Sequence, residues 1–242
     1  MGCRARYAFM LILAFVAAPA VLAQEATMDT DIMSEGFLAA HPDLRWRIEG
    51  ARSYESKQYD RALTEFQRSA RHADKPSQAI IAEMYWSGTG VATDRALAYA
   101  WMDLAAERHY FDFLVRREGM WESLDEHQRT DAVTRGQALW AEYGDDVAKP
   151  RLAKVLRRER KVTGSRTGYV GGLSILPFTG PLAGKNIYIS GDRYYAAKYW
   201  QPEKYWELQD AIWKAPLKGR VQVGDLENVP AVPAKPQDGK DR

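Results

Sequence analysis

The stretch Tyr85-Trp86-Ser87-Gly88-Thr89-Gly90-Val91-Ala92-Thr93-Asp94 separates two apolar segments with helical spacing and decides the fold. Before it, Asp74 can cap a helix with Pro76 in its first turn, where a missing N–H costs nothing. Asp94 can cap a second helix, and the glycines between the two helices tolerate a positive φ. The apolar residues of the second helix share one face: Leu97, Ala98, Trp101, Ala105 and Ala106. The sequence therefore predicts two helices joined by a tight turn.

A weaker copy of this pattern precedes it. From 44 to 72, apolar residues recur at steps of three and four, and a polar stretch at 55–58 interrupts them. A shift of 36 residues superposes three positions of the copies: Ala62 on Ala98, Phe66 on Met102, and Ala70 on Ala106. Such a period is typical of arrays of helical hairpins, in which small residues let helices approach closely and bulky ones fill the groove.

The better copy resembles the Sel-1-like repeat, a relative of the tetratricopeptide repeat. The family pattern is Y-x-x-G-x-G-V-x-x-D and then A-x-x-W-x-x-x-A-A, and the run from Tyr85 to Ala106 matches it. The chain departs at Ser77 and Ala82, where the family prefers Ala and Gly. The resemblance implies an all-α fold, a short α-solenoid of two to three helical hairpins. It also implies an adaptor in an envelope or secretory complex, without identifying a partner.

A third hairpin is expected after the repeat. Tyr110 to Arg117 predicts its first helix, and Ser123-Leu124-Asp125-Glu126 predicts a capping box for a second helix that ends at Tyr143. Lys149-Pro150 is expected to begin a last helix that ends near Lys161. Beyond 163, the runs 169–176 and 186–190 have β-type composition and could pair as a β-hairpin.

The first 23 residues have the three parts of a secretory signal, in the required order. Basic Arg4 and Arg6 precede an apolar run from Tyr7 to Val16, and small residues end at Ala23. The run is shorter than the roughly 20 residues that a membrane-spanning helix needs, so a retained anchor is the less favoured alternative. We expect cleavage near Ala23, a periplasmic or secreted mature protein, and no transmembrane segment in it.

Composition limits the classes of partner. The only cysteine, Cys3, lies in the signal, so the mature chain can form no disulfide. Loss of Arg4 and Arg6 reduces the 34 basic residues to 32, equal to the 32 acidic residues, and a balanced charge argues against nucleic-acid binding. The predicted division of the chain is a signal peptide (1–23), a flexible lead-in (24–43), a helical repeat domain (44–162), an aromatic-rich extension (163–227) and a disordered tail (228–242).

No catalytic, cofactor or metal site is predicted. The four histidines, His41, His72, His109 and His127, form no metal-ligand grouping, and each is expected at the surface or at a helix end. The loop 180–186 has only three residues between its glycines and Asn186 in place of a Ser or Thr, so it does not match a phosphate-binding loop.

Two features are candidate contact sites. The basic run 149–166, which includes Arg157, Arg158 and Lys161, could contact anionic envelope components, although a solvated helix face is the favoured interpretation. The aromatic run 194–213 could be a ligand platform, although packing over the end or the groove of the array is favoured. Its candidate contacts are Tyr199, Trp200, Tyr205 and Trp206.

Three hypotheses of function follow. The favoured one is an exported scaffold, without catalysis, that binds a protein or peptide in the groove of its helical repeats. An alternative is an envelope enzyme or polysaccharide-binding factor that uses two of the carboxylates of Asp192, Glu203, Glu207 and Asp210. The third is a structural spacer whose C-terminal segment seals the groove.

Overall fold

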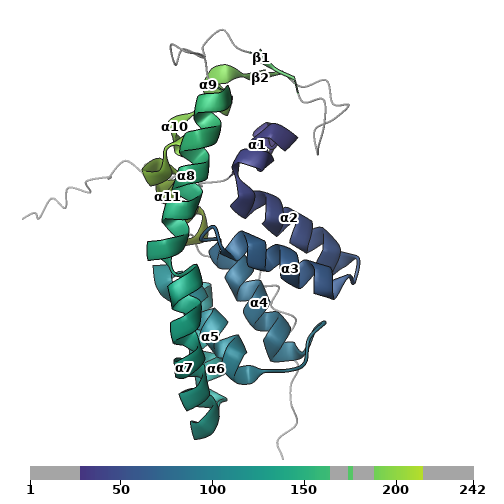
Figure 1. Cartoon of the computed structure of the whole chain (residues 1–242), viewed down its shortest axis with the longest axis vertical. Helices are drawn as coiled ribbons and strands as arrows, with labels where there is room; N and C mark the ends of the chain where they lie inside the picture. Colours follow the sequence, from purple (N-terminus) through teal and green to yellow (C-terminus); the bar gives the residue numbers. More distant parts are fainter. Residues whose placement is uncertain (1–27, 164–173, 177–187, 215–242) are drawn as a thin grey trace, which may run out of the picture.

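In the computed structural model, the described residues are 28–163, 174–176 and 188–214. The predicted cleavage site and the tail that is predicted to be disordered lie outside them. The two predicted hairpins are present, as the pairs α2 (Pro42–Glu55) with α3 (Tyr59–Ala70) and α4 (Lys75–Ser87) with α5 (Arg95–Ala105). In Figure 1 they lie side by side in chain order, because α3 also packs against α4. The all-α, solenoid-like fold is confirmed.

The turn between α4 and α5 forms as its residues require. Asp74 accepts a hydrogen bond from the backbone N–H of Ser77, and Asp94 accepts one from that of Leu97. Gly88 adopts the left-handed conformation that ends α4, with a φ of 72°. Gly90 has a φ of 73°, and a Cβ there would lie 2.1 Å from the Cβ of Tyr59. Only glycine lets this turn approach α3.

The helices after α5 depart from a simple third hairpin. The 3-10 turn η2 (Ala106–Arg108) leads to α6 (Phe111–Glu122) and α7 (Glu126–Tyr143), and both helices pack chiefly against α5 rather than against each other. The capping box of α7 is formed by Asp125 and Gln128, so its prediction at Ser123 and Glu126 was two residues early. The predicted end of α7 at Tyr143 is confirmed.

The last long helix, α8 (Asp145–Thr163), begins four residues before the predicted start at Lys149. Pro150 lies inside it and lacks the N–H that would bond to the carbonyl of Asp146. Two acidic residues in the first turn, Asp145 and Asp146, favour the earlier start because they interact well with the positive end of the helix dipole.

The prediction of a flexible lead-in is wrong for residues 30–43. This segment forms η1 (Thr30–Ile32), α1 (Glu35–Ala40) and the start of α2, and it buries Ile32, Phe37 and Leu38. These side chains pack with residues from the other end of the described chain: Ile189, Tyr194, Tyr199 and Trp200. The lead-in lacked a visible apolar period because its burial depends on this distant partner.

The aromatic-rich extension is part of the same core and not a separate appendage. It contains α9 (Gly191–Tyr194), α10 (Ala197–Trp200) and α11 (Pro202–Lys214), and both α10 and α11 pack against α8. Tyr205 of α11 is fully buried with Leu152 and Leu156 of α8. Figure 1 shows α10 and α11 beside α8.

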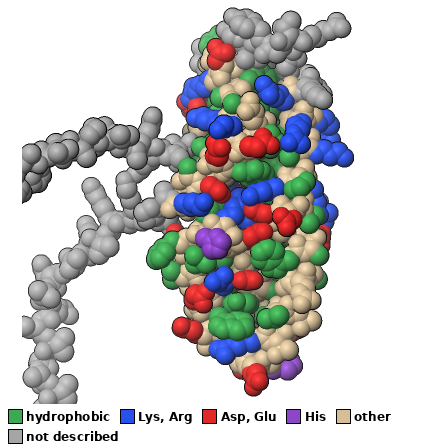
Figure 2. Space-filling model, turned by 90° about the vertical axis from the view of Figure 1, so that its left-hand side faces the viewer, with side chains coloured by type: hydrophobic (Ala, Val, Ile, Leu, Met, Phe, Trp, Pro, Cys, Tyr) green, Lys and Arg blue, Asp and Glu red, His purple; other side chains and the backbone are tan. Residues whose placement is uncertain are grey.

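The surface is mixed in charge. Figure 2 shows Lys and Arg side chains interspersed with Asp and Glu over the face that it presents, without a continuous patch of one sign. Among the helices that the structure describes, none is both long enough and apolar enough to cross a membrane.

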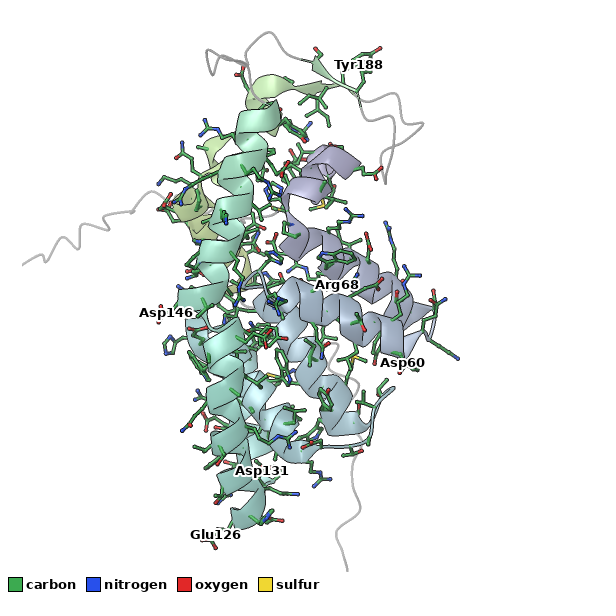
Figure 3. The ribbon with its side chains drawn as sticks, in the orientation of Figure 1. Asp60, Arg68, Glu126, Asp131, Asp146 and Tyr188 are labelled. Carbon is green, nitrogen blue, oxygen red and sulfur yellow. The ribbon has the colours of Figure 1, made fainter. Side chains whose placement is uncertain are left out.

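The predicted β-hairpin is present in short form. Strand β1 (Ser174–Ile175) pairs antiparallel with β2 (Ile189–Ser190), and Ser174 lies opposite Ser190. Ile189 is fully buried, whereas its neighbour Tyr188 projects from the strand pair and is 65% exposed (Figure 3). The buried side chain of Ile189 anchors the strand pair to the cluster around Phe37.

Replacement of Gly90 by Ala should destabilise the protein. The new Cβ would meet Tyr59, and the positive φ is strained for alanine, so we expect the free energy of unfolding to fall by about 1–3 kcal/mol. Gly119→Ala is the matched control: it lies inside α6 with no atom within 4 Å of an added Cβ, and it should stabilise the protein by about 0.5–1 kcal/mol. Urea unfolding followed by circular dichroism measures both changes. Equal effects would contradict this account of the turn.

Candidate functional site

An apolar groove of about 470 Å³ crosses the first helices of the array. Its walls come from α2, α4 and α6, with single residues from α3 and α11. The side chains that define it are Ala51, Tyr54, Glu55, Phe66, Pro76, Ala79, Ile80, Glu83, Met84, Phe113, Arg116 and Trp213. A volume of this size is typical of a site that binds a small ligand or a few side chains of a peptide.

Helical periodicity places the groove residues of α4. Pro76, Ala79, Ile80 and Glu83 recur at i, i+3, i+4 and i+7, so they line one side of the helix. The opposite side of α4 packs into the core through Ile81 and neighbouring residues. In the sequence, residues 79–86 form one apolar stretch, and the stripe that lines the groove was not predicted. A helix that is apolar on both sides was the signal that could have revealed it.

Trp213 at the end of α11 connects the two margins of the groove. Its ring lies 6.1 Å from the ring of Phe113 on α6, and the guanidinium of Arg47 on α2 lies 5.6 Å from its centre. Both α2 and α6 thus contact the last turn of α11. Trp213 belongs to the aromatic run 194–213, but its contacts with the repeat helices were not predicted.

Three charged side chains lie among the apolar walls. Glu83 and Arg116 form an ion pair across α4 and α6. Glu55, at the end of α2, is exposed and has no ion-pair partner in the described part of the chain. The groove therefore combines an apolar surface with one uncompensated negative charge at its edge.

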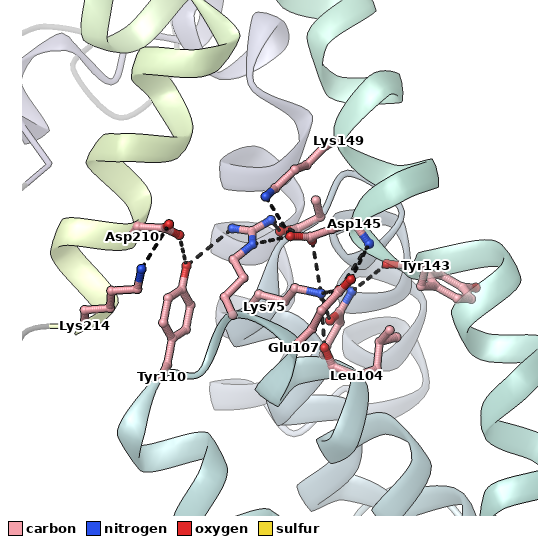
Figure 4. Close-up of polar contacts among 12 residues, drawn as sticks. Lys75, Leu104, Glu107, Tyr110, Tyr143, Asp145, Lys149, Asp210 and Lys214 are labelled. Atoms are coloured by element: carbon pink, nitrogen blue, oxygen red, sulfur yellow. Dashed lines mark hydrogen bonds and ion pairs between the residues drawn. The ribbon is translucent and has the colours of Figure 1, made fainter.

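At the start of α4, next to the groove residue Pro76, a buried charge network joins the helices (Figure 4). The Lys75 side chain is fully buried, and its Nζ donates hydrogen bonds to the Leu104 carbonyl (3.1 Å) and to Glu107 (2.5 Å). It also lies 3.2 Å from Asp145. Burial lowers the pKa of Lys75, whereas the charges of Asp145 and Glu107 oppose that change. Lys75 thus joins α4 to the end of α5 and to the start of α8.

Arg108 is the second cation of the network. It donates to both oxygens of Asp145, at 2.7 and 2.9 Å, and to the Ala73 carbonyl at 3.0 Å. Burial would raise the pKa of Asp145, but the hydrogen bonds and charge of Arg108, together with Lys75, hold this pKa well below its usual range. Tyr110 extends the network to α11 by donating to Asp210 at 2.7 Å.

Three of the four aromatic candidates are buried and the fourth is half-buried, whereas the favoured expectation placed their segment over the end or the groove of the array. Tyr199, Trp200 and Tyr205 are at most 1% exposed, so in this structure none of them lies on a surface that a partner could reach. Trp206 is half-buried, and its ring centre lies 4.9 Å from the Arg108 guanidinium. The segment covers α1, α2 and α8, and only its last aromatic residue, Trp213, reaches the groove.

Contacts of His41 hold this segment against α1 and α2. His41 lies at a helix end, which is one of the two expected places: it occupies the N-cap position of α2, and it is fully buried. Its ring stacks on Phe37 with centres 3.9 Å apart, and its two nitrogens lie 2.8 Å from the carbonyl oxygens of Phe37 and Tyr199. The second contact ties α10 to the start of α2. In addition, Tyr205 donates a hydrogen bond to buried Asp43.

The basic candidates are engaged locally. Arg157 is 63% exposed and lies 3.6 Å from Glu203 of α11, and Arg158 pairs with the adjacent Glu159. Lys161 belongs to α8, but its side chain lies outside the described residues. The contact of this helix face with anionic components stays a prediction.

Three of the four carboxylates of the enzyme hypothesis have a partner in the structure. Glu203 lies near Arg157, Glu207 pairs with Lys204, and Asp210 accepts from Tyr110. In the part of the chain that the structure describes, no cluster of three or more His, Cys, Asp or Glu could hold a metal ion. The enzyme hypothesis stays a prediction.

No protein-family model matches this chain, and no curated protein or solved structure matches it. The resemblance to the Sel-1-like repeat therefore rests on the motif residues alone.

Removal of the Asp145 charge should destabilise the fold strongly. Asp145→Asn leaves Lys75 and Arg108 buried with too little negative charge, a situation that typically costs about 3–5 kcal/mol. Asp146→Asn is the matched control, because Asp146 is the exposed neighbour at the start of α8 (Figure 3) and should change stability by at most about 1 kcal/mol. Denaturant unfolding of the two variants tests this. Similar losses in both would show that the network contributes little.

The same carboxylate predicts a dependence on pH. Because its pKa is depressed in the folded state, its stabilisation is complete above about pH 5 and is lost as the pH falls below the ordinary aspartate value of about 3.9. Between pH 5 and pH 3, the urea midpoint of the wild type should therefore fall more steeply than that of Asp145→Asn. Parallel curves for the two proteins would contradict the assignment.

Proposed function

We propose that this protein is an exported helical-repeat scaffold that binds an apolar segment of another protein or peptide in the groove of α2, α4 and α6. The observation that carries the proposal is the groove itself: an open, largely apolar surface formed by equivalent helices of successive repeats. The signal-like N-terminus supports export, and the Sel-1-like motif supports an adaptor role. Complementary surfaces are sufficient for this function, which requires no covalent chemistry.

The rigidity of the site supports the proposal. The start of α4 is held by the Lys75–Asp145–Arg108 network, and Trp213 contacts Arg47 of α2 and Phe113 of α6 at one margin of the groove. In a preformed groove, less conformational entropy of the protein is lost when a ligand binds, so a short segment can bind with useful affinity. Tyr54, Ile80 and Trp213 are the large side chains that remain partly accessible there, and aromatic anchors of this kind dominate many binding sites.

Photo-crosslinking in the native envelope tests the proposal. A photoreactive amino acid in place of Tyr54 should give a discrete crosslinked product. Ile80→Asp, which places a carboxylate in the apolar floor, should reduce its yield about tenfold or more. Val133→Asp is the matched control, since Val133 is an exposed apolar residue of α7, outside the groove. A product that persists with Ile80→Asp, or no product in any form, would refute binding in the groove.

A further inference from the structure

The described chain ends inside the candidate site. Trp213 lines the groove, and α11 ends at the next residue, Lys214. The sequence continues as Ala215-Pro216-Leu217-Lys218-Gly219-Arg220-Val221-Gln222-Val223. Their placement lies outside the described residues, so the inference uses only their chemistry and their point of attachment. Any segment that follows Lys214 starts at the margin of the groove.

The distance that such a segment must span is short. The walls of the groove come from α2, α4 and α6, and Trp213 lies at its margin. Seven residues in extended form reach about 23 Å, which is roughly twice the diameter of a helix with its side chains. The segment that follows Lys214 is therefore long enough to lie along the groove.

The residue pattern of the segment matches the surface of the groove. In an extended chain, alternate side chains point to opposite sides, so Leu217, Val221 and Val223 would share one side with Gly219. Lys218 and Arg220 would share the other. The apolar side suits the walls formed by Ala79, Ile80 and Phe113. The long side chains of the two cations suit Glu55 at the edge of the groove, which has no ion-pair partner among the described residues.

We propose that residues 215–223 occupy the groove in the resting protein, as an intramolecular ligand that a partner must displace. The inference rests on the proposed function, since it assigns an occupant to the same groove. Attachment at Lys214 strongly favours this occupant, because short flexible tethers give effective concentrations in the millimolar range. A free partner present at micromolar concentration must therefore bind the groove more tightly than the tethered segment does.

Disulfide crosslinking tests the occupancy directly, because the chain has only one cysteine. In a Cys3→Ser background, the pair Ile80→Cys and Val221→Cys should form an intramolecular disulfide under mild oxidation. The matched control pair, Val133→Cys and Val221→Cys, places the first thiol on α7, outside the groove, and should form less than about a tenth of that product. Equal yields from the two pairs would overturn the proposal.

Competition tests the regulatory consequence in the full chain. A synthetic peptide of residues 215–227 should bind the double variant Leu217→Asp/Val221→Asp at least about tenfold more tightly than the wild type, as measured by fluorescence anisotropy. Adding Ile80→Asp to that double variant should abolish the gain. Equal affinity for the wild type and the double variant, or no binding to either, would overturn the proposal.

The crosslinking at position 54 separates the two proposals. If the photoreactive protein still captures its partner through the groove while the peptide fails to bind, the intramolecular ligand is wrong and the proposed function stands. If the peptide binds the double variant and partner capture is insensitive to Ile80→Asp, the groove serves its own segment and the proposed function fails. Capture that rises when Leu217→Asp/Val221→Asp is introduced would support both.

Discussion

The bidentate pair between Arg108 and Asp145 is the contact on which the arrangement of this protein depends. It joins the end of the second hairpin to the first turn of α8, and Lys75 connects both to α4. The chain has a single cysteine, Cys3, and so can form no intramolecular disulfide; this junction is held by packing and charge. Two buried cations and the carboxylates of Asp145 and Glu107 balance each other, which keeps the energetic cost of desolvation tolerable.

Once the start of α8 is fixed, the elements at both ends of the described chain can pack against this helix. The N-terminal α1 and the C-terminal α10 and α11 all pack against it, and they meet each other around Phe37 and His41. Segments more than 150 residues apart thus share one cluster, with the His41–Tyr199 contact at its centre. The same arrangement brings Trp213 to the groove, so the aromatic extension supports the candidate site from its margin instead of forming a platform of its own.

The groove therefore depends both on the local formation of helices and on contacts between distant segments. The two hairpins supply α2 and α4, and the helix that follows them supplies α6; the local patterns of these helices were visible in the sequence. The closing contacts of Trp213 with Phe113 and Arg47 come from a helix that begins more than 90 residues after the second hairpin ends. Such contacts carry no signal in a single sequence, because no spacing connects Trp213 to its partners. The groove residues of α4 are visible in the sequence as apolar residues, but their role was ambiguous. A stripe such as Pro76, Ala79 and Ile80 could equally pack against a neighbouring helix.

By itself, the sequence determined the helical hairpins, their caps and the turn at Gly88 and Gly90, because capping, helical period and positive φ are local properties. It also indicated the short strand pair and the end of α7. Only the tertiary structure decided that the lead-in folds, that α8 starts at Asp145, and that Tyr199, Trp200 and Tyr205 are buried. These outcomes depend on contacts between segments far apart in the chain, and the burial of a side chain is a property of what lies against it.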